Sequence, residues 1–237
     1  MPAVAADVVR RADITAADLV FDVGAGTGAL TEPLRRTGAR VVAIERDPAA
    51  VRRLQRRFGA EVRIVGGDLL EVPLPGRPFR VVANPPFATT TALLRRLLSS
   101  ANLSAADLVL ARGVVTALAG RRPSEAALRW AVRYELTFGR RLDRSCFRPA
   151  PSVDAAVLVV RRRATDLVRG PARAAYDELV GRGHARSGIA WPDAARGVLT
   201  HRQIVRAAGD LGLDRRASAA SLTASDWGAL ADLSRPR

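Results

Sequence analysis

The sequence contains no lysine, and all 38 of its lysine-or-arginine residues are arginine. With 23 acidic residues, the formal net charge is +15. Such an excess attracts polyanions and makes their association salt-sensitive. The absence of lysine beside abundant alanine and arginine is typical of the codon bias of a GC-rich genome. That bias explains the choice of arginine over lysine but not the excess over acids, so we predict nucleic acid as a partner.

Cysteine and histidine are almost missing as well. The single cysteine, Cys146, excludes an internal disulfide and a zinc cluster, and the two histidines, His184 and His201, have no metal-ligand spacing. We therefore expect no metal cofactor. No histidine is near Cys146 in the sequence, so we interpret it as a small packed side chain rather than a nucleophile.

Long apolar segments are also missing. No stretch approaches the roughly 20 residues needed to cross a bilayer, and the N-terminus lacks the arrangement of a signal peptide. We therefore expect a cytoplasmic protein without a membrane partner. The 237 residues fit one large domain with a small appendage.

Strand and helix patterns alternate over the first half of the chain. We expect buried strands at residues 19–23, 41–44, 62–65, 80–83 and 108–110, and helices at 4–12, 29–36, 48–58 and 89–98. This alternation indicates an α/β fold with a parallel sheet covered on both faces. Residues 134–142 and 155–160 have too short a link for a crossover helix, so we expect an antiparallel pair at the sheet edge.

Beyond residue 163 the pattern is helical, with helices expected at 172–181, 201–211 and 226–233, the last behind a Thr223 cap. The predicted division is therefore a catalytic α/β domain at 1–163 and a small all-α domain at 164–237. Nothing in the sequence demands more than a monomer.

Four polar residues, Asp22, Glu45, Asp68 and Asn84, end successive predicted strands. In an open parallel sheet ligands bind beyond the carboxyl ends of the strands, so we expect these residues to share one crevice. The glycines after Asp22 allow a tight turn and close approach to a ligand. Glu45 could accept hydrogen bonds from two ribose hydroxyls and Asp68 one from an adenine amino group. None of these residues suits a pyrophosphate group. This mismatch favours S-adenosylmethionine over a dinucleotide as the ligand.

The segment Asn84-Pro85-Pro86-Phe87 indicates methyl transfer to an exocyclic amine. An adenine N6 amine is a poor nucleophile because its lone pair is delocalised into the ring. The Asn84 side-chain oxygen and the Pro85 carbonyl could each accept one amine hydrogen and aim the lone pair at the donor methyl. Phe87 could stack on a base rotated out of its helix or could be a core side chain under the loop. A cytosine C5 methylase would need a catalytic cysteine here.

These segments resemble the ribosomal RNA adenine N6-methyltransferases, most closely the erythromycin-resistance family that acts on large-subunit ribosomal RNA. The resemblance is carried by Asp22-Val23-Gly24-Ala25-Gly26-Thr27-Gly28-Ala29-Leu30-Thr31, Glu45-Arg46-Asp47, Gly67-Asp68, Asn84-Pro85-Pro86-Phe87 and Phe147-Arg148-Pro149-Ala150-Pro151-Ser152-Val153-Asp154. The last segment is the most discriminating, because general methyltransferases do not share its Phe-x-Pro-x-Pro-x-Val pattern.

The resemblance implies a Rossmann-like methyltransferase domain with a seven-stranded mixed sheet, a small helical RNA-binding domain, and methylation of a 23S rRNA adenine that confers macrolide-type resistance. It implies a catalytic set of Asn84, Pro85 and Phe87. The S-adenosylmethionine site would include Asp22, Gly24, Ala25, Gly26, Gly28, Glu45, Arg46, Asp68, Leu69 and Asn84. Candidate RNA phosphate contacts are Arg112, Arg140, Arg141, Arg161, Arg162 and Arg163.

The sequence departs from this family at two places. Family members usually carry an N-terminal Gln-Asn/His-Phe-Leu segment over the methionine end of the donor, whereas this chain begins almost at the following helix. Either the start has been trimmed or the donor is held more weakly. Pro85 stands where the family typically has isoleucine or leucine. A small-subunit rRNA dimethylase, a DNA adenine methylase and a catalytically silent RNA-binding relative are the alternatives.

Overall fold

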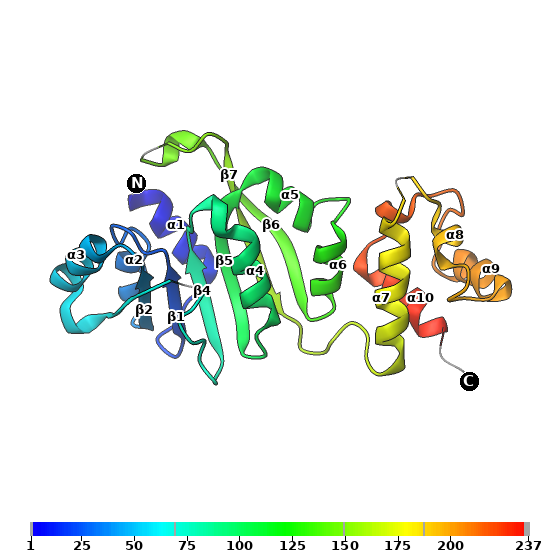
Figure 1. Ribbon diagram of the computed structural model, residues 1–237, viewed down its shortest axis with the longest axis horizontal. Helices are drawn as coiled ribbons and strands as arrows, with labels where there is room; N and C mark the ends of the chain where they lie inside the picture. Colours follow the sequence, from blue (N-terminus) through cyan, green and yellow to red (C-terminus); the bar gives the residue numbers. More distant parts are fainter. Residues whose placement is uncertain (1, 69, 149, 187, 235–237) are drawn as a thin grey trace. The chain divides into compact units, whose positions relative to one another are not determined.

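The computed structural model describes residues 2–68, 70–148, 150–186 and 188–234, which divide into two compact units (Figure 1). The first unit comprises Met1–Val115 and Thr137–Arg162, and the second Thr116–Leu136 and Arg163–Arg237. The sequence-based division at residue 163 put residues 116–136 in the first domain, whereas the structure puts them in the second unit. Leu128 and Val132 of this segment belong to the helical core, and the Tyr176 hydroxyl donates to the Leu128 carbonyl at 2.8 Å.

A seven-stranded sheet has the order β3-β2-β1-β4-β5-β7-β6. Its strands are β1 (Leu19–Val23), β2 (Arg40–Glu45), β3 (Arg63–Gly66), β4 (Phe79–Ala83), β5 (Leu103–Ala111), β6 (Tyr134–Leu142) and β7 (Ala155–Arg162). The pairs from β3 through to β5 are parallel, and β7 runs antiparallel to β5 with Leu108 opposite Leu158. The predicted mixed α/β sheet, with β6 and β7 together at its end, is confirmed.

Helix α1 (Pro2–Ala12) precedes the first strand, and parallel strands of the first unit are connected by α2 (Thr31–Arg35), α3 (Pro48–Phe58) and α4 (Thr90–Ser99), with the short 3₁₀ helices η1 (Gly59–Glu61) and η2 (Phe87–Thr89). Val8 and Val9 of α1 join one core cluster with Val20, Val41 and Leu34. Strands buried in this way lack solvent-facing positions, and that explains why they are almost continuously apolar in the sequence.

Helix α3 begins where the sequence predicts, because its first turn is capped twice. The Asp47 carboxylate accepts hydrogen bonds from the backbone N–H groups of Ala49 and Ala50, and Pro48 occupies the first helical position. Gly59, with a φ of 53°, follows its last residue. Helices α5 (Arg112–Ala119), α6 (Glu125–Ala131) and α8 (Trp191–Ala195) were not predicted.

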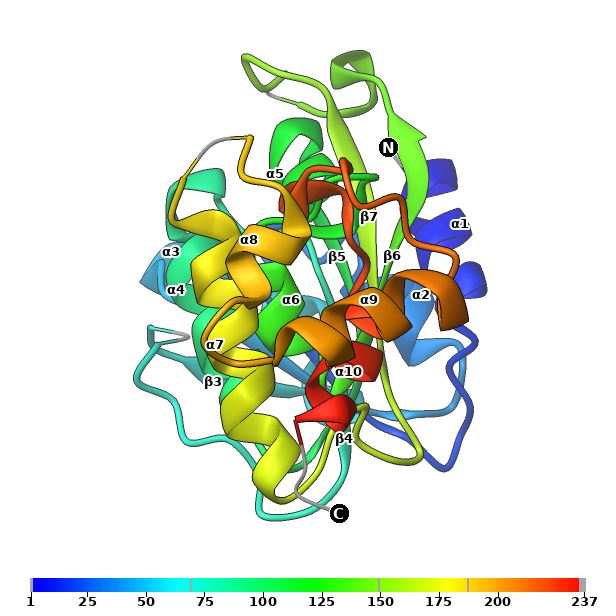
Figure 2. The same cartoon turned by 90° about the vertical axis from the view of Figure 1, so that its right-hand side faces the viewer.

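The second unit is built from α6, α7 (Pro171–His184), α8, α9 (His201–Asp210), the 3₁₀ helix η4 (Ala219–Ser221) and α10 (Ala224–Leu233). Figure 2 shows α7 to α10 coloured from yellow to red. Their shared core contains fully buried Trp191, Trp227 and Tyr176. The predicted Thr223 cap is present as a capping box with Asp226. No helix within the described ranges is long and apolar enough to cross a membrane.

Candidate active site

A cavity of about 770 Å³ opens at the carboxyl ends of β1 to β4. Val23 ends β1, Glu45 ends β2, and Asp68 and Asn84 lie just beyond β3 and β4. The predicted meeting of strand ends therefore brings three of the four polar residues to one cavity. The fourth, Asp22, does not line it.

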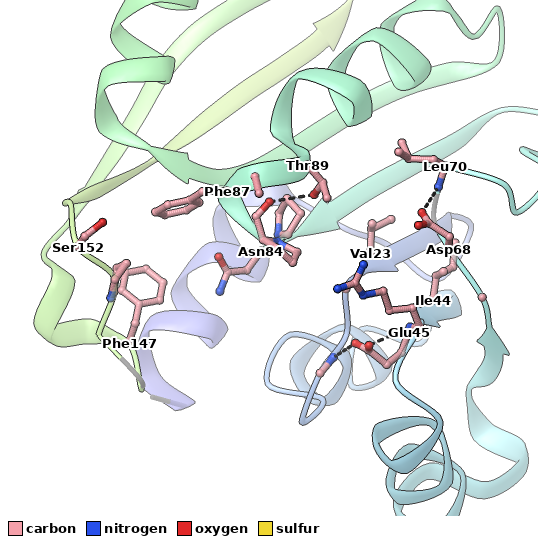
Figure 3. A pocket seen from close by; sticks show the side chains of 18 of the residues that line it. Val23, Ile44, Glu45, Asp68, Leu70, Asn84, Phe87, Thr89, Phe147 and Ser152 are labelled. Carbon is pink, nitrogen blue, oxygen red and sulfur yellow. Dashed lines mark hydrogen bonds between the residues drawn. The ribbon is translucent and has the colours of Figure 1, made fainter.

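On one side of the cavity, two carboxylates are held by backbone amides (Figure 3). Glu45 Oε2 accepts from the Gly26 N–H at 2.8 Å, and Glu45 Oε1 accepts from the N–H groups of Arg46 and Asp47 at 2.8 and 2.9 Å. Asp68 Oδ1 accepts from the Leu70 N–H at 2.8 Å. A carboxylate has about four acceptor positions, so both retain capacity for donors on a ligand.

The glycines of the turn after β1 have different roles. Gly24 and Gly26 line the cavity and have φ values of 72° and 54°. A Cβ on Gly24 would lie 3.5 Å from Pro86 Cδ, so this turn and the Asn84 loop approach closely. Gly28 does not line the cavity. A Cβ there would meet the Phe58 ring at 2.6 Å, so Gly28 allows the turn to pack on α3.

The opposite side of the cavity carries the segment from Asn84 to Phe87. The Asn84 side chain is exposed and makes no hydrogen bond with another described residue. Pro86 supplies a carbonyl that accepts from both the Thr89 N–H at 3.0 Å and the Thr89 hydroxyl at 2.9 Å, so Thr89 adds to the stiffness that the prolines provide. Phe87 is half-buried: it lines the cavity and also packs against the core. Its position is therefore compatible with both predicted roles, stacking on a base and packing under the loop.

A second aromatic side chain, Phe147, lies on the same side of the cavity in Figure 3. It belongs to the link between β6 and β7, which also brings Ala150, Pro151 and Ser152 to the cavity wall. Phe147 was not among the predicted site residues. The signal was present, because this residue opens the Phe-x-Pro-x-Pro-x-Val segment, but no local pattern shows that this segment folds back to Asn84.

Asp22 is buried beneath the glycine turn, and its Oδ2 accepts a hydrogen bond from the Thr31 hydroxyl at 2.6 Å. Burial raises the pKa of Asp22 to about 7, and the nearby Glu45 carboxylate adds to this rise. Asp22 and Ala25 line a second cavity, of about 670 Å³. Of the other predicted donor-site residues, Arg46 lines the first cavity and Leu69 lies outside the described residues.

Arg161, one of the predicted RNA contacts, has a structural partner. Its guanidinium donates to both carboxylate oxygens of buried Asp107, at 2.8 and 3.1 Å. Burial raises the pKa of Asp107, and the facing Arg161 opposes that rise. This bidentate pair neutralises a charge on the sheet, which accounts for an arginine at position 161 without any RNA.

The other arginines of that set also contact the protein itself. Arg140 pairs with Asp7, Arg112 with Asp154 at 3.6 Å between nitrogen and oxygen, and the Arg141 guanidinium lies 5.9 Å from the centre of the Phe138 ring. Arg162 and Arg163 donate to the carbonyls of Ala101 and Ala131 at 3.3 and 2.9 Å. Their contacts with RNA stay a prediction.

Residues 2–184 match the model of a family described as ribosomal RNA adenine dimethylase. The chain belongs to this family. The resemblance recognised from the sequence motifs is thereby confirmed, since the match covers every segment that carried it. The last part of the helical unit, from residue 185 onward, lies beyond the matched range.

Two relatives and one solved structure illustrate the likeness to the dimethylase family. The mycinamicin-resistance protein MyrB of Micromonospora griseorubida is 38% identical over 170 residues, 70% of this chain and 54% of that relative. The chain thus spans about half the length of MyrB. The ribosomal RNA small subunit methyltransferase A of Synechococcus sp. (strain JA-3-3Ab) is 33% identical over 248 residues, 98% of this chain and 88% of that protein. The crystal structure of the 23S rRNA methyltransferase ErmE covers 98% of both chains with a TM-score of 0.91 at 24% identity, which confirms the fold.

Proposed function

We propose that this protein is a methyltransferase that uses S-adenosylmethionine to methylate N6 of an adenine in 23S rRNA, once or twice, and thereby confers resistance to macrolide-type antibiotics. One observation carries the proposal: a single cavity is lined by Glu45 and Asp68 on one side and by Asn84 and Phe87 on the other. A ribosomal RNA substrate places the enzyme in the cytoplasm, and we propose that it acts as a monomer.

The residues present fit the donor. Glu45 is fixed by backbone amides and keeps acceptor capacity for the two ribose hydroxyls, while Asp68 can accept from the adenine amino group. Gly24 and Gly26 let the backbone lie against the ligand. The bound donor supplies a methyl group made reactive by its positive sulfur. Two acidic side chains and one arginine, Arg46, are the charged groups among the described lining residues, a balance unsuited to pyrophosphate.

The acceptor side fits an adenine that has left its helix. Phe87 and Phe147 offer two aromatic faces against which a base can stack. The unpaired Asn84 oxygen and the Pro85 carbonyl can each accept a hydrogen of N6, which directs the nitrogen lone pair toward the methyl group. With the donor bound, transfer of its methyl group would form an N–C bond at N6 as the C–S bond breaks, and the proton that N6 then releases would pass to water beside the exposed Asn84 side chain. Positioning and fixed dipoles therefore supply the catalysis.

Expression in a macrolide-sensitive bacterium tests the proposal. The wild-type chain should permit growth at drug concentrations that kill cells carrying Asn84→Ala at the same protein level. Mass spectrometry of nucleosides from the extracted 23S RNA should show more N6-methylated adenosine in the wild type than in the variant. Primer extension should also stop at one 23S adenine in the wild type if that adenine is dimethylated, because a single methyl group leaves N6 a hydrogen for base pairing. Survival conferred equally by both versions would contradict the proposal, because resistance would then not come from this site.

A second candidate is dimethylation of small-subunit rRNA. It is favoured by the relative named as a ribosomal RNA small subunit methyltransferase, whose match spans 98% of this chain. The same primer-extension experiment separates the two, since the stop would lie in 16S rather than 23S RNA and drug survival would not change. DNA adenine methylation and a silent RNA-binding role are the remaining alternatives. Calorimetry with the donor tests the silent RNA-binding role, because a catalytically silent protein should bind RNA without needing the donor.

A further inference from the structure

The second cavity, of about 670 Å³, adjoins the first. Gly24, Gly26, Asn84 and Phe147 line both cavities, so the two share a wall at the glycine turn and the acceptor loop. In S-adenosylmethionine the sulfur lies between the adenosine and the amino-acid end. If the adenosine lies at Glu45 and Asp68 and the sulfur at Asn84, the amino-acid end extends past the shared residues into the second cavity.

The charges of the second cavity complement that end of the donor. Most described residues of its wall are apolar, including Val4 and Val8 of α1, Leu30 and Val109. Asp22 and Arg148 are the ionisable acid and base among the described residues that line it, apart from Cys146. The amino-acid end of the donor carries one ammonium group and one carboxylate. An acidic side chain can pair with the first and a basic side chain with the second.

Arg148 is available for a ligand. Its side chain is exposed and forms no ion pair or hydrogen bond with a described residue. This distinguishes it from Arg140, paired with Asp7, and from Arg161, paired with Asp107. A guanidinium offers a planar pair of donors that matches a carboxylate. Asp22, in contrast, is buried at the base of the turn, where the Thr31 hydroxyl fixes one of its oxygens.

We propose that Arg148 binds the carboxylate of the donor's amino-acid end in the second cavity, while Asp22 faces its ammonium group. This inference rests on the proposed methyl donor and extends it to a residue outside the predicted donor site. Phe147 and Arg148 are adjacent in the chain, so one segment would then contact both the acceptor base and the donor.

Calorimetry with three ligands tests the assignment. S-adenosylhomocysteine has both charges, its decarboxylated analogue has only the ammonium group, and 5′-methylthioadenosine has neither. Arg148→Gln should weaken binding of S-adenosylhomocysteine by about tenfold, as expected for a partly exposed charge-assisted hydrogen bond, and should change the other two affinities by less than about twofold. Arg148→Lys should recover part of the loss. Because the site is exposed, the tenfold effect should shrink in high salt.

Arg144→Gln is the matched control, since Arg144 is exposed in the same link but is not among the residues lining either cavity. It should leave all three affinities unchanged. In the wild type, the decarboxylated analogue should bind more weakly than S-adenosylhomocysteine and more tightly than 5′-methylthioadenosine. This comparison needs no variant, so it holds even if a substitution disturbs folding.

The outcomes separate this inference from the proposed function. Equal loss of all three ligands in Arg148→Gln, or no loss of any, would overturn the role of Arg148 while the donor assignment stands. Equal wild-type affinity for the decarboxylated analogue and 5′-methylthioadenosine would overturn the role of Asp22. If the wild type binds none of the three ligands, the donor assignment fails and the inference fails with it.

Discussion

The two sides of the main cavity differ in how their polar groups are satisfied. On the side proposed to bind the donor, Glu45 accepts from three backbone N–H groups and Asp68 from one. On the acceptor side, the Asn84 carboxamide has no hydrogen-bond partner among the described residues. The folded chain thus fixes the Glu45 and Asp68 carboxylates itself, whereas it leaves the Asn84 carboxamide to solvent or to a ligand.

This difference predicts separate effects of substitution. A change on the donor side removes contacts that the folded chain already makes, so it should alter donor affinity and stability together. A change at Asn84 removes nothing that the free protein uses, so it should alter turnover and leave stability intact.

The largest effect is expected at Asn84. Asn84→Ala should lower the rate of methyl transfer by about 10²- to 10³-fold, the loss typical of one preorganised polar group that acts on the reacting atoms. Donor affinity measured by calorimetry and the melting temperature should change little. Asn102→Ala is the control, because Asn102 donates to the Pro75 carbonyl and lines neither cavity. Equal losses of rate and donor affinity in Asn84→Ala would remove the distinction between the two sides.

The next largest effect separates two glycines of the donor-side turn. Gly28→Ala combines a positive φ of 81° with a Cβ 2.6 Å from the Phe58 ring, so it should lower the free energy of unfolding by about 3 kcal/mol. Gly26→Ala has no atom nearer than 3.9 Å to its Cβ and should lower it by about 1 kcal/mol, from backbone strain alone. Urea unfolding measures both. If Gly26→Ala were the more destabilising change, packing on α3 would not be the reason for Gly28.

Asp22 should give the donor side a pH dependence that the acceptor side lacks. Its pKa is raised from 3.8 to about 7, so between these values the unfolded chain holds fewer protons and stability falls as pH rises. The free energy of unfolding of Asp22→Asn relative to wild type should therefore increase from about pH 4 to about pH 7, by at most about 1.4 kcal/mol per unit, and level off above. Urea midpoints at four pH values measure this. A difference that stays constant with pH would show that Asp22 is ionised throughout.

A smaller effect than at Asn84 is predicted at the two carboxylates proposed to bind the donor. Glu45→Gln and Asp68→Asn should each weaken donor binding by about tenfold, because each replaces a charge-assisted hydrogen bond with a neutral one. The rate at saturating donor should stay within about threefold of wild type. Calorimetry and steady-state rates measure the two quantities. A large drop in rate with unchanged affinity would place these carboxylates with Asn84 rather than with the donor.

Much of the first unit could be predicted because its signals are local. Strand β1 was predicted with its observed bounds, since the apolar run from Leu19 ends at the glycine turn, and α3 was predicted because Asp47 and Pro48 mark its start. Helices α5 and α6 were missed. No helix-breaking residue separates the end of β5 from the start of α5, and the breaking signal between α5 and α6 is the segment from Arg121 to Ser124. Helix α8 has five residues, too few for a periodic pattern.

The site was predictable where strand ends carry polar residues and was not where distant segments meet. Glu45, Asp68 and Asn84 could be brought together by the rule for parallel sheets. Phe147 and Arg148 reach the cavities through the link between β6 and β7, which no spacing reveals. Gly28 was placed with the donor by its position in the motif, whereas the structure packs it on Phe58. Asp22 was placed there on the same ground; it lines the second cavity, and its carboxylate accepts a hydrogen bond from Thr31.

Methylation of purified ribosomal RNA tests the central claim most directly. The protein is incubated with S-adenosylmethionine labelled on its methyl group and with protein-free 23S or 16S rRNA, and the digested nucleosides are identified by mass spectrometry. We predict label in N6-methylated adenosine from 23S RNA with the wild-type protein and none with Asn84→Ala. Label in another nucleoside, or label from 23S RNA with both proteins alike, would contradict it.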